Sequence, residues 1–212
     1  MTASTKTTRH TARRRKALAQ AAAAMLLVAA TAACAASSSG VVYSSDFTAG
    51  YDPRSLSAAM SRAPLLVETY GSPAPGQASE DVARASALAL REHGPSWLPR
   101  NYTDSATDAG NGPYHLRIAY GLPKAFDRQL LCSAGMSVQT AEAARRQGET
   151  GSTRSVASLC RGETVLGVAE GAPAATDIAS EGFAAFVGRL GRETMPRRNP
   201  VLDDDCMFRF CD

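Results

Sequence analysis

Histidine and aromatic residues are scarce in this chain, which limits the chemistry it can support. Three histidines occur among 212 residues, and the aromatic share is 6%. Only His93 and His115 lie beyond the first 33 residues, so a catalytic triad or a histidine-rich metal site has few candidate residues. The chain also contains neither a GxSxG nor an HExxH motif. These absences argue against the common serine-hydrolase and zinc-protease classes.

Long hydrophobic runs are also absent, apart from one at the beginning. A basic segment that includes Arg13, Arg14 and Arg15 and no acidic residue precedes residues 17–33, which are apolar except for Gln20 and Thr31. The apolar run is shorter than the roughly 20 residues of a membrane-spanning helix. A basic segment followed by a short apolar run is typical of an export signal. We therefore expect residues 1–33 to be a signal peptide.

The end of this run, Thr31-Ala32-Ala33-Cys34, resembles the lipobox of bacterial lipoproteins, although Leu is more common at the place of Thr31. The resemblance implies that Cys34 carries diacylglycerol and an acyl chain such as palmitate, which would anchor the protein to a membrane. Ala35, which follows, points to the outer membrane rather than the inner. Because residues 33–35 also fit ordinary signal cleavage, a secreted, soluble periplasmic form is the alternative.

Removal of the signal changes the sign of the net charge. The whole chain has a formal charge of +3, and the six basic residues of the leader account for more than this excess, so the remainder carries −3. A mildly acidic protein is a poor ligand for nucleic acid, which we do not expect as a partner.

Five cysteines, an odd number, indicate that one has a separate role. They are Cys34, Cys132, Cys160, Cys206 and Cys211. With Cys34 assigned to lipid, four remain, as expected for disulfides in an oxidising compartment. Three pairings are open, of which we favour Cys132 with Cys160 and Cys206 with Cys211. No CxxC spacing or neighbouring histidine supports zinc, and we expect neither a metal nor a cofactor.

Composition divides the exported part into a tether and one domain. Residues 34–54, rich in Ser, Gly and Ala, are predicted to form a lipid-anchored flexible tether. Residues 55–212 are long enough for a single hydrophobic core. Within them, 121–153 is predicted to be an insertion, partly mobile, with a short helix at 139–146, and 206–211 a C-terminal cysteine loop.

Hydrophobic periodicity predicts three helices and four strands in the domain. Helices are expected at 56–63, at 79–93 with Ser79 as N-cap, and up to Met195 with either Asp177 or Ser180 as N-cap. Strands are expected at 65–70, 114–120, 155–160 and 163–170, the last two joined at Arg161-Gly162. In 79–93 the apolar stripe is assigned to Val82, Ala85, Leu88 and Ala89. From residue 65 the order is β-α-β-β-β-α. It predicts an α/β (α+β) two-layer sandwich, with two helices on a four-stranded, mainly antiparallel sheet.

This order, together with the lipobox and tether, resembles small envelope lipoproteins such as the lipopolysaccharide-assembly lipoprotein. Leu131-Cys132 and residues 157–162 also resemble a family of exported bacterial proteins without an assigned activity. Neither resemblance implies a catalytic residue, and fold alone does not determine function.

Two groups of residues are candidate interaction sites. Alternation in 114–120 places His115 and Arg117 on the outer, largely solvated side of a strand, where they form a candidate ligand face. Phe208, Arg209 and Phe210 lie between two cysteines and either fold back on the core or dock a partner protein.

The sequence favours a non-catalytic, lipid-anchored periplasmic domain that acts as an accessory or scaffold in the cell envelope, with an envelope protein as its partner. The alternative is a periplasmic module that binds a small molecule or lipid on the exposed sheet face. A third hypothesis, an enzyme with dispersed carboxylates, has no nominated residues.

Overall fold

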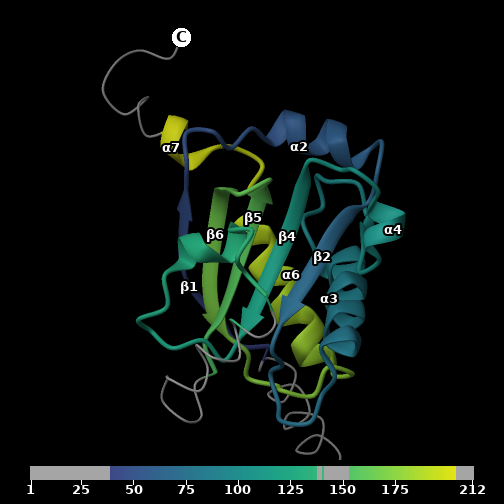
Figure 1. Ribbon diagram of the computed structural model, residues 1–212, viewed down its shortest axis with the longest axis vertical. Coiled ribbons are helices and arrows are strands. Elements are labelled where there is room, and N and C mark those ends of the chain that lie inside the picture. Colours follow the sequence, from purple (N-terminus) through teal and green to yellow (C-terminus); the bar gives the residue numbers. More distant parts are fainter. Residues whose placement is uncertain (1–38, 138–139, 141–152, 204–212) are drawn as a thin grey trace, which may run out of the picture. The chain divides into compact units, whose positions relative to one another are not determined.

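The computed structural model of the chain describes residues 39–137, 140 and 153–203. The predicted signal peptide, Cys34, the 139–146 helix apart from residue 140, and the 206–211 loop, with Cys206, Cys211 and Phe208 to Phe210, lie outside the described residues. The described part contains a six-stranded mixed sheet in the order β1-β6-β5-β4-β2-β3 (Figure 1). The pairs β1–β6, β6–β5 and β5–β4 are antiparallel, whereas the pairs β4–β2 and β2–β3 are parallel.

The elements follow one another along the chain in the order β1, α2, β2, α3, β3, α4, β4, η1, β5, β6, α6, α7. The strands are β1 (Val41–Phe47), β2 (Leu65–Tyr70), β3 (Tyr102–Thr103), β4 (Tyr114–Tyr120), β5 (Ser155–Arg161) and β6 (Thr164–Ala172). The α-helices are α2 (Pro53–Met60), α3 (Ser79–His93), α4 (Ala106–Ala109), α6 (Glu181–Thr194) and α7 (Pro200–Asp203), and η1 (Arg128–Cys132) is a 3₁₀ helix.

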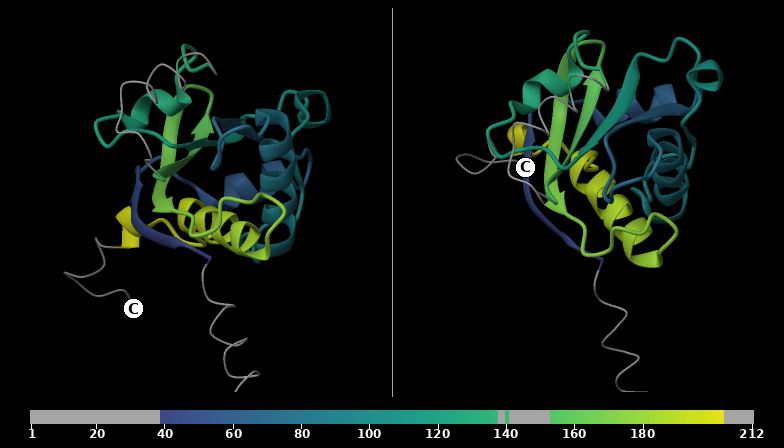
Figure 2. Two further views of the ribbon diagram at one scale, coloured as in Figure 1. Left: turned by 90° about the horizontal axis from the view of Figure 1, so that it is seen from below. Right: turned by 60° about the horizontal axis from the view of Figure 1, so that its bottom comes forward.

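Helices α3 and α6 pack on one face of the sheet, which we call the helix side (Figures 1 and 2). The contact between the two helices depends on glycine in α6. A Cβ at Gly188 would lie 2.3 Å from the Cβ of His93, and one at Gly191 would lie 2.4 Å from a methyl carbon of Leu90. Because these positions carry no side chain, the two helices approach closely above the sheet.

The alternation predicted for 114–120 is confirmed on the helix side. Tyr114, Leu116, Ile118 and Tyr120 are buried in the main core. Phe183 and Phe186 of α6 are also fully buried there. Ser180 caps α6, since its Oγ accepts a hydrogen bond from the Phe183 N–H at 3.2 Å.

The opposite face of the sheet carries a second, smaller core. It is covered by the segment 122–136, which includes η1, and we call this face the η1 side. Its buried members include Leu122, Leu131, Val156 and Val168. The sheet is therefore covered on both faces, by helices on one and by an irregular segment on the other.

The coarse fold class, a mixed α+β domain built on a sheet, is confirmed, but the sheet has six strands instead of four. The prediction of a flexible tether at 34–54 is wrong for residues 41–47, which form strand β1. Val42 and Phe47 pack against the main core, and β1 pairs with β6 along its length. The strand was not predicted because its few apolar residues lie in a segment rich in Ser and Gly.

Local boundaries also differ. Ser79 is the first residue of α3, and Ala78 occupies the N-cap position without a side-chain hydrogen bond. The hairpin turn is Gly162-Glu163 rather than Arg161-Gly162, because Arg161 still pairs with Thr164 and Gly162 takes the left-handed φ of 58°. Helix α2 begins at Pro53, after an Asp52 N-cap, and ends at Met60.

The predicted stripe on α3 is wrong at Leu88, which is 48% exposed. The buried positions are Val82, Ser86, Ala87, Ala89 and Leu90. Ser86 takes a core position because its hydroxyl is hydrogen-bonded to the Tyr120 hydroxyl at 3.1 Å.

Candidate functional site

The predicted disulfide between Cys132 and Cys160 is present and lies on the η1 side. It joins the last residue of η1 to β5, with the two Cα atoms 5.5 Å apart, within the usual range for disulfides. Both cysteines are buried in the second core. The disulfide thus fixes the 122–136 segment against a central strand of the sheet.

The sequence predicted that Arg117 lies on a solvated ligand face, and this prediction is wrong. Its side chain is 15% exposed, and its Nε lies 2.7 Å from the Glu68 carboxylate. Its Nη1 donates to the backbone carbonyls of Leu131 at 3.0 Å and Ser133 at 3.1 Å. Arg117 therefore holds the end of η1 on the sheet. Its side chain is covered because residues 122–136, part of the expected insertion, pack over this face of the sheet.

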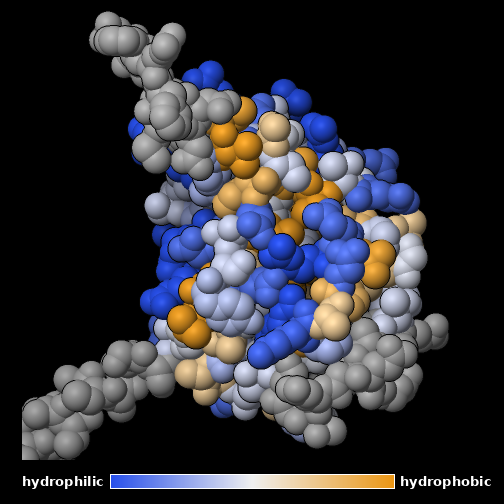
Figure 3. All heavy atoms as spheres, turned by 90° about the vertical axis from the view of Figure 1, so that its left-hand side faces the viewer, coloured by the Kyte–Doolittle hydropathy of each residue, from blue (hydrophilic) through white to orange (hydrophobic). Residues whose placement is uncertain are grey.

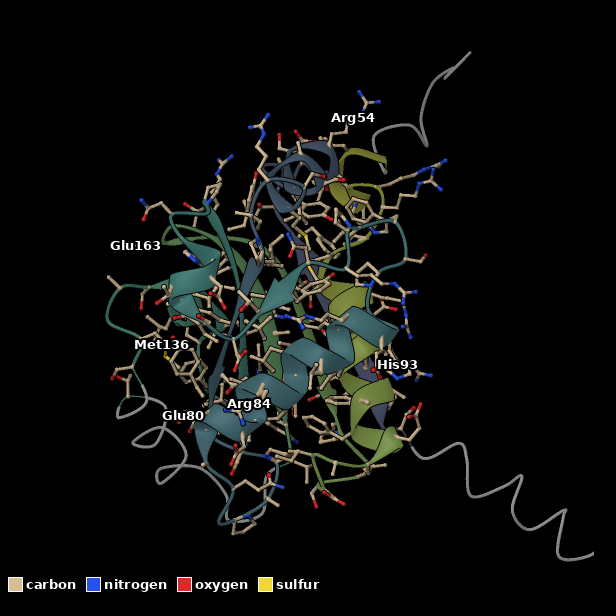
Figure 4. All side chains as sticks on the ribbon, turned by 90° about the vertical axis from the view of Figure 1, so that its right-hand side faces the viewer. Arg54, Glu80, Arg84, His93, Met136 and Glu163 are labelled. Atoms are coloured by element: carbon tan, nitrogen blue, oxygen red, sulfur yellow. A yellow bond between two sulfur atoms is a disulfide. The ribbon has the colours of Figure 1, made fainter. Side chains whose placement is uncertain are left out.

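The two histidines have different surroundings. His115 is half-buried on β4, and desolvation lowers its pKa, with Glu68 and Arg117 acting in opposite directions. His93 ends α3 beside α6 (Figure 4), where its Nε2 lies 3.5 Å from a Glu181 carboxylate oxygen and its carbonyl accepts from Arg192.

An open hollow of about 530 Å³ lies on the η1 side, next to the edge strand β1. Its wall combines two aromatic residues with cationic and anionic side chains. The wall takes Tyr43 from β1, Glu170 from β6 and Arg154 from the position before β5. The segment around η1 supplies Lys124, Phe126, Asp127 and Arg128. The side of the molecule that shows β1 has hydrophilic residues gathered across its centre, with hydrophobic residues around them (Figure 3).

A β-bulge in β1 positions the aromatic residue of this hollow. Val42 pairs with Gly171 and Ser44 with Glu170, so Tyr43 is an extra residue with no partner on β6. Val42 contacts the main core on the helix side, whereas Tyr43 lines the hollow on the η1 side and is 54% exposed. Bulges often redirect a side chain next to a functional site, and this one brings a tyrosine to the hollow.

A buried carboxylate organises the charged residues of the hollow. Glu170, whose side chain is 9% exposed, lies 2.8 Å from Arg154 Nε and 3.0 Å from Arg128 Nη1. Arg128 also lies 2.6 Å from Asp46, and Arg154 donates to the Pro123 carbonyl at 2.5 Å. A carboxylate held between two guanidinium groups is fixed in position, which is a requirement for a selective binding site.

The Tyr43 phenol lies within the influence of the same groups. Desolvation and the Glu170 carboxylate raise its pKa, and Arg154 offsets part of this rise. The phenol therefore stays protonated at neutral pH and remains a hydrogen-bond donor as well as an acceptor.

A second polar hollow, of about 410 Å³, lies beside the start of α3 and includes Glu80, Arg84 and Asp104. Arg84 is 3.2 Å from Asp81 and 3.9 Å from Asp104 (Figure 4 labels Glu80 and Arg84). These are exposed ion pairs of low expected energy, and the wall lacks an aromatic ring. The hollow beside β1 is therefore the stronger candidate.

Within the described ranges, no three His, Cys, Asp or Glu residues are grouped so that they could hold a metal ion. In the same part of the chain, no helix has the length and apolar character needed to cross a membrane.

Comparison with known proteins yields no relative. No family model, no curated protein and no solved structure matches this chain.

Sequence reasoning missed the residues of the hollow, because they come from segments between positions 43 and 170 and form no local motif. One signal was available. Glu170 is a carboxylate at the end of the predicted strand 163–170, and a charged residue facing a covered side of a sheet needs partners. Its partners, Arg128 and Arg154, could not be identified before the η1 segment was known to cover this face of the sheet.

Proposed function

We propose that this protein is a non-catalytic, lipid-anchored domain of the bacterial cell envelope, facing the periplasm, that acts as an accessory or scaffold for an envelope partner. The anchor is the lipid on Cys34, with the outer membrane favoured over the inner. The folded sheet is the part that presents binding surfaces.

The observation that carries this proposal is the Cys132–Cys160 disulfide. It is buried and joins η1 to a central strand. Structural disulfides persist in oxidising compartments and are rare in the cytosol, so the cross-link supports export.

The test is the intact mass of the protein purified from a membrane fraction, measured before and after reduction with thiol labelling. We expect a mass that begins at Cys34 and includes a diacylglyceryl group and an acyl chain. We also expect four thiols to become reactive only after reduction.

The matched control is Cys34→Ala, which is expected to remove the lipid and release the protein from the membrane while the Cys132–Cys160 disulfide still forms. An unlipidated mass in the wild type would contradict the anchor. A reactive Cys132 or Cys160 thiol before reduction would contradict the oxidising location.

A second candidate function, a small-molecule binding module, is favoured by the hollow beside β1. The sequence placed such a site at His115 and Arg117. Arg117 is engaged with Glu68 and the η1 carbonyls, so the site would instead lie across β1 and β6 on the same side of the sheet.

A further inference from the structure

We propose that the hollow beside β1 binds a neutral saccharide, with one sugar ring stacked on Tyr43. The proposal deepens the second candidate function and rests on it, and it concerns the hollow lined by Tyr43, Lys124, Phe126, Asp127, Arg128, Arg154 and Glu170. Four observations support it: the exposed ring, the mixture of donors and acceptors, the balance of charge and the volume.

The first observation is the combination of bulge and exposure. Tyr43 occupies an unpaired position in β1, and its ring is half exposed although it borders a network of buried charges. A flat aromatic face surrounded by polar groups complements a sugar ring, which presents C–H groups on one face and hydroxyls around its edge. Tyrosine suits this contact because its ring is apolar and its hydroxyl remains polar.

The second observation is that donors and acceptors are available together. Arg128 and Arg154 offer N–H donors, Glu170 and Asp127 offer carboxylate acceptors, and the Tyr43 phenol offers both. A sugar hydroxyl both donates and accepts, so it can bind between such groups. The Arg–Glu pairs hold these groups in place before a ligand arrives, which reduces the cost of ordering them.

The third observation is charge. Lys124, Arg128 and Arg154 are balanced by Asp127 and Glu170 in the wall and by Asp46, which binds Arg128. A phosphate or a carboxylate ligand would need a surplus of cations. Because three cations face three carboxylates, the hollow has no such surplus, and a neutral polar ligand fits better than an anion.

The fourth observation is size. The hollow of about 530 Å³ falls in the range of typical small-molecule sites, about 300–1,000 Å³. It is open to solvent, which would allow one residue of a longer glycan to enter while the remainder stays outside.

The test is saturation-transfer difference NMR on the purified, oxidised full-length protein in detergent. The probes are the methyl glycosides of glucose, galactose, arabinose and N-acetylglucosamine, with glucose 1-phosphate and inorganic phosphate as anionic probes. We expect transfer to the ring protons of at least one neutral glycoside, competed by excess of the same sugar.

Three variants locate the binding. Tyr43→Ser and Tyr43→Leu, which both remove the ring, should weaken binding about tenfold, whereas Tyr43→Phe should retain most of it. Leu88→Ser is the matched control, because Leu88 has a similar exposure but lies on α3 on the helix side. Circular dichroism and the intact Cys132–Cys160 disulfide would show that each variant is folded.

Absence of transfer from every neutral glycoside would overturn the proposal, as would binding unchanged in folded Tyr43→Ser and Tyr43→Leu. Binding of the phosphate probes alone, abolished by Lys124→Ala, would also overturn it and assign an anion site instead. The intact mass of the same preparation reports on the lipid anchor separately, so failure of one proposal leaves the other to be judged on its own result.

Discussion

The two faces of the sheet are stabilised by different means. On the helix side, two amphipathic helices with capped or charged ends bury a continuous apolar core, and glycines bring them together. On the η1 side, an irregular segment is held by a disulfide, by Arg117 and by the Glu170 network. Regular secondary structure satisfies its own backbone groups, whereas an irregular cover needs side chains to do so. The second arrangement also leaves room for a hollow with fixed polar groups.

The largest effect is expected from the helix side. Phe186 of α6 is fully buried in the main core, and Phe186→Ala should lower the free energy of unfolding by about 3–5 kcal/mol. Urea unfolding followed by circular dichroism would measure it. Glu193→Ala, at an exposed position of the same helix, should change stability by less than about 0.5 kcal/mol. A small effect of Phe186→Ala would mean that the helix side is not the main source of stability.

Removal of the disulfide tests the cover on the η1 side. Cys132→Ala with Cys160→Ala opens a loop of 28 residues and should cost about 3–4 kcal/mol. Amide hydrogen exchange should show lost protection in η1 and β5, with α3 and α6 still protected at moderate denaturant. Equal loss of protection in both layers would contradict the independence of the two faces.

Removal of the Arg117 side chain, which holds the end of η1, should have a smaller effect on stability. Arg117→Met removes the ion pair with Glu68 and the hydrogen bonds to the carbonyls of Leu131 and Ser133, at a cost of about 2 kcal/mol. Thermal unfolding of the oxidised protein would measure this cost. Arg62→Met, at an exposed position, is the control and should be nearly neutral. If the two variants were equally stable, the disulfide alone would hold η1.

The smallest effect concerns pH. Desolvation lowers the pKa of His115 in the folded protein below its ordinary value of 6.5, so the unfolded chain takes up a proton first as the pH falls. Stability should therefore decrease slightly on acidification from pH 7 through the range between the unfolded and folded pKa values. Comparing the pH dependence of the melting temperature in wild type and His115→Gln would show it, since the variant should lack this component.

The elements with a strong local pattern were predictable. Strands β2 and β4 and helix α3 lie at the expected residues, because each has a clear period and clear breakers around it. The Cys132–Cys160 pairing followed from parity and was confirmed. Strand β1 was missed because an edge strand with several serines depends on a neighbouring strand, β6, rather than on its own pattern.

The candidate site was less predictable than the fold. Arg117 was assigned to a solvated face, since alternation shows which side chains share a face but not what covers that face. The residues of the hollow come from four separate segments, and a single-residue bulge decides which way Tyr43 points.

The sequence by itself determined the main α+β elements, and it favoured the Cys132–Cys160 disulfide among three possible pairings, because these features depend on local period and cysteine count. The export signal stays a prediction from local composition. Tertiary structure decided the six-strand order, the burial of Arg117 and the assembly of the hollow around Glu170. These features depend on contacts between segments far apart in the chain, and local patterns do not encode which segments will meet.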